Sequence, residues 1–315
     1  MKVSIIVPIY GVEKYIEQCA ESLFLQDYPY IEYIFVDDCT PDDSINILED
    51  TLKRFPERQP SVKVLYHATN RGLGASRLTG LREATGDAIM HVDSDDLLPL
   101  DAVSKLANEM QRMDADIVEG GHSTCNNGII SINPVRRLPS KKRYIKRILC
   151  QDITPFNVWA KLYKRSLFFE NNVFFVEGID YGEDLSIVPR LIYCSQRISR
   201  ISDTVYIYRI DNSHSYTHEI SKKNIYSCIQ ANNTIYSFFK DKQEYANALS
   251  IGMINNYRNA RTRHLDFEYL EQELLFSPRT HFERLLVNLF LCKSFSFALS
   301  NFLYKSVRFI IAYIL

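Results

Sequence analysis

Apolar and polar positions along the first hundred residues predict four strands separated by helices. Residues 3–9 form an unbroken apolar run, which is typical of a strand buried on both faces of a parallel sheet. From Val12 to Leu23 the apolar positions recur with helical spacing. The same reasoning predicts strands at 33–36, 62–66 and 88–92, and helices at 44–55 and 75–84.

Repeated strand–helix units of this length predict an α/β protein with a Rossmann-like, doubly wound mixed sheet. Each crossover is expected to be right-handed, and the ligand crevice should lie at the carboxyl ends of the strands. Farther along, residues 70–74 indicate a flexible turn and residues 101–118 a helix and a short strand, and residues 120–133 are polar and contain glycine. The chain then returns through 198–201 and 205–209.

Polar side chains gather at the predicted strand ends. Tyr10, Asp38 and Asn70 each follow a strand, and Asp93, Ser94, Asp95 and Asp96 follow the fourth. Clustered carboxylates repel one another unless a cation is near, and Mg²⁺ and Mn²⁺ prefer such oxygen ligands. The alternative is a solvated turn that caps the next helix. Convergence of polar groups from four units on one crevice favours a metal site.

Two charged segments follow. Residues 136–147 carry seven Lys and Arg, which indicates a solvated face, or alternatively contact with an anionic acceptor or lipid headgroups. Gly182, Glu183 and Asp184 open an apolar helix. Acids in a first helical turn suit the helix dipole, but capping alone does not call for two adjacent acids after a glycine. A functional pair is therefore the favoured interpretation.

From about Ser221 onward the pattern changes to long helices. We expect one domain at 1–215 and a helical C-terminal region at 216–315. No acid follows Glu283, whereas Arg284, Lys293, Lys305 and Arg308 remain among many aromatic residues. The apolar runs are too interrupted for a transmembrane span. A helix lying in a membrane interface is favoured, and a partner-binding or intramolecular helix is the competing interpretation.

Composition narrows the class of protein. The net charge of −1 gives no general attraction to nucleic acid. Seven scattered cysteines without CxxC spacing indicate neither a disulfide framework nor a zinc site, so a reducing cytosol fits best. The first apolar run is short and interrupted by Pro8, so we expect no signal peptide.

The ordered motifs resemble a known family. SIIVPIYG, FVDDCTPDDS, NRGLGASRLTGL, ATGDAIMHVDSDD and YGEDLSIVPRL together resemble family 2 glycosyltransferases with the A-type nucleotide-diphospho-sugar transferase fold. The nearest likeness is to bacterial enzymes of capsule, exopolysaccharide or lipopolysaccharide synthesis, and it covers about residues 1–215. CTPDD and SRLTG depart from the commonest pattern of the family, but Asp38 and Arg77 are retained.

The resemblance implies a donor site. Tyr10 would stack on the nucleotide base beside Pro8, and Asp38 would accept the uracil imide N–H. Asn70 and Arg77, with Arg71 a less certain candidate, would contact the ribose or diphosphate. Asp93, Ser94 and Asp95 form the DxD motif, in which Asp93 and Asp95 would hold Mg²⁺ or Mn²⁺ on the diphosphate.

The resemblance also implies the chemistry. Asp184 would be the base of an inverting displacement, with Glu183 beside it, and Lys161 and His214 could reach the diphosphate or metal. We therefore expect sugar transfer from a UDP-sugar to a glycan or lipid-linked acceptor, at the cytoplasmic face of the cell membrane; the oligomeric state stays open.

Two other functions compete. A sugar-nucleotide nucleotidyltransferase would use a related sheet, but PIYGVEKY stands where its glycine-rich loop belongs. A non-catalytic membrane-associated protein with the same fold is disfavoured by the intact acids.

Overall fold

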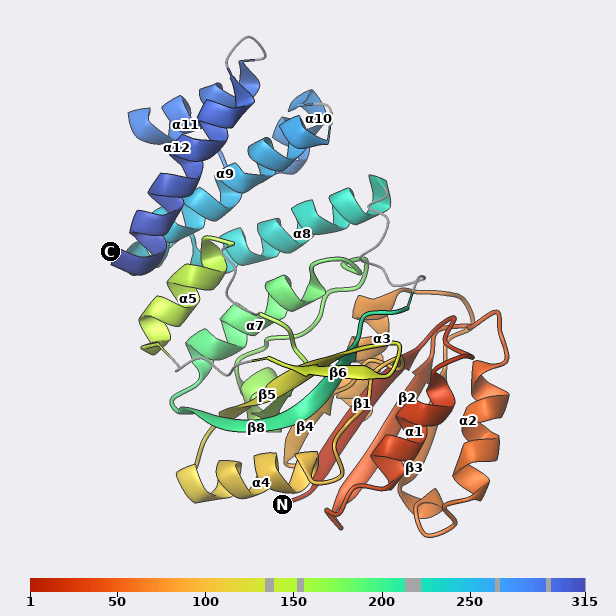
Figure 1. Ribbon diagram of the computed structural model, residues 1–315. Helices are drawn as coiled ribbons and strands as arrows, with labels where there is room; N and C mark the ends of the chain where they lie inside the picture. Colours follow the sequence, from red (N-terminus) through yellow and green to blue (C-terminus); the bar gives the residue numbers. More distant parts are fainter. Residues whose placement is uncertain (134–138, 152–155, 213–221, 264–266, 293–295, 315) are drawn as a thin grey trace. The chain divides into compact units, whose positions relative to one another are not determined.

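The computed structural model describes the chain except residues 134–138, 152–155, 213–221, 264–266, 293–295 and 315 (Figure 1). Two compact units are present. The sheet unit comprises residues 1–137, 157–183 and 194–220, and the helical unit comprises residues 138–156, 184–193 and 221–315.

The sheet unit is built on one mixed sheet, as predicted. Its strands are β1 (Val3–Ile9), β2 (Ile31–Asp37), β3 (Val62–Tyr66), β4 (Ala88–His91), β5 (Ile117–Asn126), β6 (Ile129–Ile132), β7 (Lys161–Lys164) and β8 (Ile198–Arg209). They are ordered β3-β2-β1-β4-β7-β5-β6, with β8 on β5. The first four strands are parallel, β7 is antiparallel to β4 and β5, and β8 is parallel to β5.

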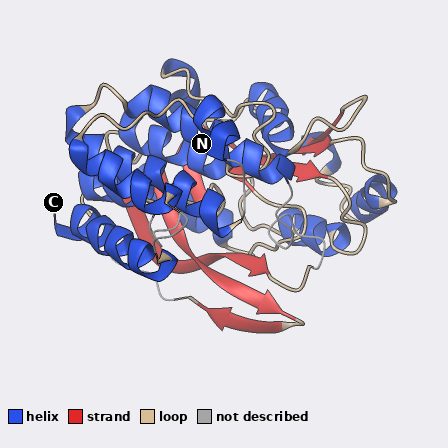
Figure 2. Ribbon diagram, turned by 90° about the horizontal axis from the view of Figure 1, so that it is seen from above, coloured by secondary structure: helices blue, strands red, loops and turns tan. Residues whose placement is uncertain are grey.

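Helices cover both faces of this sheet (Figure 2). Helices α1 (Ile16–Phe24), α2 (Ser44–Lys53) and α4 (Ala102–Met113) share a core with the side chains of β1 that include Val3 and Ile5. Helix α3 (Leu73–Glu83) packs on the opposite face. There a Cβ on Gly80 would lie 2.4 Å from the Ile6 side chain, so this glycine permits the close helix–sheet contact. The short helices are η1 (Gln59–Ser61) and α6 (Arg165–Glu170).

The prediction was incomplete where strands depend on distant partners. The short strand expected to end by residue 118 continues as β5 to Asn126 and pairs with β6 through a turn. Asn127 and Gly128 have φ angles of 48° and 80°, which suits an Asn-Gly hairpin turn. Residues 198–201 and 205–209 form the single strand β8.

The helical unit contains the long helices that the sequence predicts. They are α5 (Lys141–Leu149), most of α7 (Glu183–Cys194), α8 (Lys222–Phe239), η2 (Gln243–Tyr245), α9 (Ala246–Thr262), α10 (Phe267–Glu273), α11 (His281–Leu291), α12 (Phe297–Phe309) and η3 (Ile310–Ile314). Tyr304 is fully buried, and its hydroxyl donates to the carbonyl of Ile251 over 3.1 Å. In the basic segment, α5 buries Tyr144, Ile145 and Ile148 and exposes residues 141–143. No helix in the described ranges is long and apolar enough to cross a bilayer.

Glu32 of β2 gives a first prediction. Its carboxylate accepts hydrogen bonds from the backbone of Thr85 (2.6 Å) and Gly86 (2.9 Å), and it pairs with Lys2. Burial alone would raise the pKa of Glu32, but the contact with Lys2 and the hydrogen bonds from Ser4 and Thr85 lower it to about 2. The folded pKa is depressed, so the stabilisation is complete above the ordinary value of 4.5 and declines as the pH falls toward 2.

Glu32→Gln should therefore lower the free energy of unfolding at pH 7 by about 1–3 kcal/mol. The difference from wild type should shrink at pH 3, as measured by urea unfolding. Exposed Glu49→Gln is the matched control. An equal difference at both pH values would contradict the assignment.

Candidate active site

The acidic cluster that follows β4 is held by strand β8. The Tyr206 hydroxyl accepts from the backbone N–H of Asp93 (3.0 Å) and donates to Asp96 (2.7 Å). The backbone N–H of Arg209 donates to Asp96 over 2.7 Å, and Asn212 donates to the Asp95 carboxylate over 2.8 Å. Residues more than a hundred positions apart thus fix the orientation of these carboxylates.

The carboxylates of the cluster lie close to one another and are wholly or partly buried, which raises the pKa of two of them. Burial raises the pKa of Asp95, and the charge of Asp93 raises it further. Burial, and then the charges of Asp95 and Asp93, hold the pKa of Asp96 well above its usual range. The solvated, helix-capping turn considered for this cluster does not describe Asp96: it is fully buried and bonded to β8, and Asp101 occupies the N-cap position of α4.

Arg77 joins the cluster to the acid that opens α7. Its Nη2 donates to Asp93 Oδ1 over 2.9 Å and lies 3.5 Å from Glu183 Oε1. The Arg77 side chain is 1% exposed, and its guanidinium lies 5.9 Å from the centre of the Phe175 ring. The two acidic motifs recognised in the sequence therefore meet in the sheet unit through one buried cation.

Asp38 organises the loop between β3 and α3. Its carboxylate accepts from the backbone N–H groups of Arg71 (2.8 Å) and Gly72 (2.7 Å), and its Oδ1 lies 2.7 Å from His67 Nδ1. Asp38 is 3% exposed, whereas Asn70 is exposed on the same loop. Asp38, which is predicted to accept a hydrogen bond from uracil, thus also holds the backbone of this loop, a role that the sequence did not indicate.

The loop that carries Arg71 is packed tightly rather than flexible, which corrects the prediction for residues 70–74. Gly72 has a φ angle of 89°, and a Cβ there would lie 2.1 Å from Asp180. A Cβ on Gly74 would lie 2.5 Å from the Ile179 carbonyl. Arg71 and Glu177 form a two-pronged ion pair at 2.9 and 2.8 Å. These contacts hold the segment that leads to Glu183.

The loop after β1 presents Tyr10. Its aromatic side chain is 45% exposed, whereas Pro8 is buried inside β1 and Ser94 is 6% exposed. The backbone N–H groups of Gly11 and Glu13 donate to Thr40 and Asp42, both over 2.9 Å. The CTPDDS turn therefore fixes the loop that displays Tyr10.

The remaining predicted residues lie as follows. Glu183 is 8% exposed, and Asp184, the next residue of α7, belongs to the helical unit. The Lys161 ammonium donates to the Asn157 carbonyl over 2.7 Å and lies 3.9 Å from Glu119. His214 lies outside the described residues.

A second group of residues near the acids is aromatic. Trp159 stacks on Tyr206 and Tyr208, with ring centres 4.7 and 5.4 Å away, and meets His122 edge to face. Sequence reasoning missed Tyr206, Arg209 and Asn212 as partners of the acids. The alternating pattern of VYIYR was the available signal, since Tyr206 and Tyr208 share one face of a strand.

Asp93 and Asp95 could hold a hard divalent cation. Four acids, Asp93, Asp95, Asp96 and Glu183, share this part of the sheet unit with the guanidinium groups of Arg77 and Arg209. Within the described ranges no three His, Cys, Asp or Glu side chains are arranged as a metal site. Two protein carboxylates completed by phosphate oxygens and water are a common Mg²⁺ arrangement, so the donor set fits.

Comparisons with known proteins agree with this geometry. The sequence profile described as glycosyl transferase family 2 matches residues 4–170. The chain is 34% identical over 221 residues to the uncharacterized glycosyltransferase EpsJ of Bacillus subtilis, covering 68% of this chain and 62% of EpsJ. It is 26% identical to the poly(ribitol-phosphate) beta-N-acetylglucosaminyltransferase TarS of Staphylococcus aureus, covering 73% of this chain and 39% of TarS. The chain thus spans less than two-thirds of either relative.

Solved structures share the fold. Residues 1–349 of S. aureus TarS in complex with UDP superpose with a TM-score of 0.67 at 20% identity, covering 98% of this chain and 91% of that one. A mannosyltransferase from Pyrobaculum calidifontis, in complex with GDP-Man and Mn²⁺, gives a TM-score of 0.52 at 17% identity, with 99% and 85% covered. The A-type fold expected from the resemblance is confirmed. The chain belongs to glycosyl transferase family 2.

Proposed function

We propose that this glycosyltransferase moves a sugar from a UDP-sugar to a hydroxyl of a glycan or lipid-linked acceptor in cell-surface polysaccharide synthesis, with inversion at the anomeric carbon. The observation that carries the proposal is the Arg77 bridge between Asp93 and Glu183, because it brings the donor-side acids and the start of α7 together. The TarS structures in complex with UDP support the choice of nucleotide.

Donor recognition would fall to the loops after β1, β2 and β3. The exposed ring of Tyr10 is available to stack on a base. A carboxylate has about four acceptor positions, and Asp38 uses three of them, which leaves one for the uracil imide N–H. Exposed Asn70 would reach the ribose or the diphosphate.

Asp93 and Asp95 would hold Mg²⁺ or Mn²⁺ on the diphosphate, and the cation would neutralise charge on the departing UDP. Arg77 would fix the Asp93 carboxylate. Asp184 would accept the proton of the acceptor hydroxyl as the new bond forms. Glu183, held by Arg77, would set the position of the first turn of α7.

Release of UDP tests this function. With Mn²⁺ and a panel of UDP-sugars, the wild-type protein should release UDP, and Asp95→Ala should lower the rate by about 10²–10³-fold because charge stabilisation is lost. Asp50→Ala, at a site 75% exposed, is the control and should leave the rate unchanged.

Four results would redirect the assignment. Full activity of Asp95→Ala, or activity that survives chelation, would contradict the metal role. Pyrophosphate release from a nucleoside triphosphate would indicate a nucleotidyltransferase, and UDP-sugar binding without turnover across many acceptors would indicate a non-catalytic protein.

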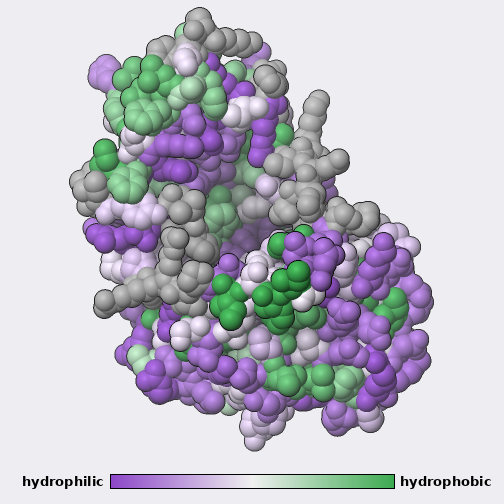
Figure 3. All heavy atoms as spheres, in the orientation of Figure 1, coloured by the Kyte–Doolittle hydropathy of each residue, from purple (hydrophilic) through white to green (hydrophobic). Residues whose placement is uncertain are grey.

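The helical tail would bind the cytoplasmic face of the membrane. Helices α11 and α12 expose Phe282, Leu285, Leu299, Phe302 and Phe309, and green hydrophobic atoms gather over this part of Figure 3. The flanking charges after Glu283 are all basic, which suits anionic headgroups.

Phe302→Ser combined with Phe309→Ser should reduce flotation with vesicles that contain anionic lipid, because two exposed rings are removed from the apolar face. Tyr30→Ser, which removes a ring that is 64% exposed in the sheet unit, is the control. Equal flotation of both variants would argue against the interfacial role.

A further inference from the structure

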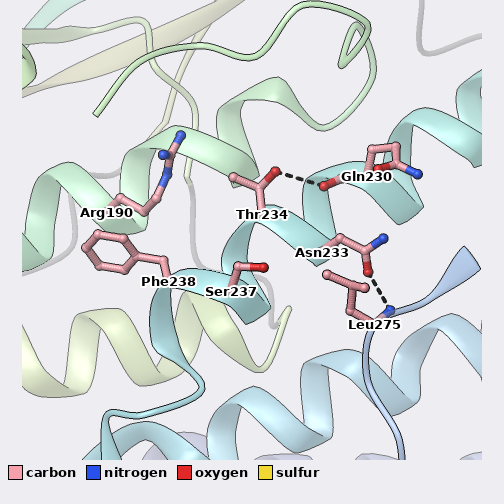
Figure 4. Close-up of a pocket in the computed structure, with 7 residues that line it drawn as sticks. All are labelled: Arg190, Gln230, Asn233, Thr234, Ser237, Phe238 and Leu275. Atoms are coloured by element: carbon pink, nitrogen blue, oxygen red, sulfur yellow. Dashed lines mark hydrogen bonds between the residues drawn. The ribbon is translucent and has the colours of Figure 1, made fainter. Parts of the chain in front are cut away.

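The helical unit contains a pocket that none of the roles above uses. Its volume is about 490 Å³, within the range of about 300–1,000 Å³ that is usual for ligand sites. Arg190 of α7, several residues of α8 and Leu275 line it (Figure 4). None of the described residues that line the pocket is acidic. All of its lining residues belong to one compact unit.

Two of the lining residues are fixed by internal hydrogen bonds. The Asn233 amide donates to the carbonyl of Glu273, and its oxygen accepts from the backbone N–H of Leu275, both over 2.8 Å. The Thr234 hydroxyl donates to the backbone carbonyl of Gln230 over 2.9 Å. Asn233 thereby ties the segment after α10 to α8, so this wall of the pocket is preformed.

Two other lining residues keep their hydrogen-bonding groups available. Within the described part of the chain, the Gln230 carboxamide and the Ser237 hydroxyl have no hydrogen-bond partner, and neither residue is buried. They are seven positions apart on α8, which places them on one face about 10 Å apart along the axis. Such a spacing suits an extended polyhydroxylated ligand better than a single small ion.

The pocket also offers an aromatic surface and a guanidinium. Phe238 and Arg190 lie on the same side of Figure 4. The Lys242 ammonium lies 4.2 Å from the centre of the Phe238 ring. Arg190 Nε donates a hydrogen bond to the Ser186 carbonyl. An aromatic ring beside amide, hydroxyl and guanidinium groups can accept the C–H face of a sugar and bond its hydroxyls.

We infer that this pocket binds a saccharide segment of the acceptor glycan, an inference that rests on the proposed function. The amide of Gln230 and the hydroxyl of Ser237 bond sugar hydroxyls, and Phe238 packs against a sugar ring. Binding of one segment in the pocket keeps the glycan on the enzyme and so raises the local concentration of its reacting end.

Saturation-transfer NMR on the full chain tests the inference, with chitohexaose, maltohexaose and a hyaluronan hexasaccharide as probes. At least one hexasaccharide should bind the wild-type protein. Gln230→Ala should weaken that binding by about 3- to 10-fold through the loss of one hydrogen bond. Ser237→Trp should reduce it further by filling the pocket.

Controls separate the pocket from the active site. Gln243→Ala, on an exposed residue outside the pocket, should bind like wild type, and so should Asp95→Ala. In transfer assays Gln230→Ala should raise the acceptor KM and leave acceptor-independent UDP-sugar hydrolysis unchanged. The inference is overturned if no probe binds, or if both pocket variants bind as wild type does. Failure of the wild type to release UDP would instead refute the proposed function and leave the NMR result standing.

Discussion

Arg77→Met is expected to lower the free energy of unfolding by about 3–5 kcal/mol, because it leaves two acids around a site that has lost its cation. The Arg77 side chain is 1% exposed and contacts both Asp93 and Glu183. The loss should be measured by urea unfolding. Sugar transfer should fall with it, because neither carboxylate keeps its orientation.

A double variant keeps this prediction testable if Arg77→Met folds poorly. Adding Asp93→Asn removes one of the uncompensated charges and should restore part of the stability. Arg71→Met is the matched control, since its ion pair with Glu177 is exposed and should contribute less than about 1 kcal/mol. Equal losses for Arg71→Met and Arg77→Met would show that the buried bridge has no special role.

Asp184→Asn is expected to reduce kcat by about 10²–10⁴-fold, the usual contribution of a general base. The substitution preserves size but removes the ability to accept a proton. The affinity for UDP should remain that of the wild type, because the donor residues are untouched. Transfer rates and UDP titrations on the same preparation measure the two effects separately.

Glu183→Gln distinguishes the two adjacent acids. Because Glu183 contacts Arg77, its replacement should lower stability more than it alters the pH profile of kcat. If Asp184→Asn kept the wild-type rate while Glu183→Gln lost it with unchanged stability, the roles proposed for these residues would be exchanged.

Much of the fold was predictable from local pattern. The bounds of β1 agree with the prediction because a nearly continuous apolar run is sufficient to define a strand buried along its whole length. The bounds of β3 also agree, although this strand contains Lys63 and none of its residues is buried. Helix α1 begins at Ile16 rather than Val12. The reason is tertiary: the backbone N–H groups of Gly11, Val12 and Glu13 donate to side chains of the β2–α2 turn.

The extent of β5 was missed for a related reason. Residues 120–124 are glycine or polar, so their propensity does not indicate a strand. These residues pair with β8, which comes much later in the chain. This pairing supplies the hydrogen bonds that keep them extended. The domain boundary between residues 215 and 216 stays a prediction. Each of the two compact units of the structure consists of three separate segments of the chain.

The sequence by itself determined the type of sheet, the family, and the acidic motifs at Asp93–Asp96 and Glu183–Asp184, because period and motif spacing are local properties. Only the tertiary structure decided that one buried guanidinium joins Asp93 to Glu183, that Asp38 holds the Arg71–Gly72 backbone, and that Asp96 bonds to β8. The physical reason is that a buried charge needs a partner, and folding selects that partner from residues far apart in the chain.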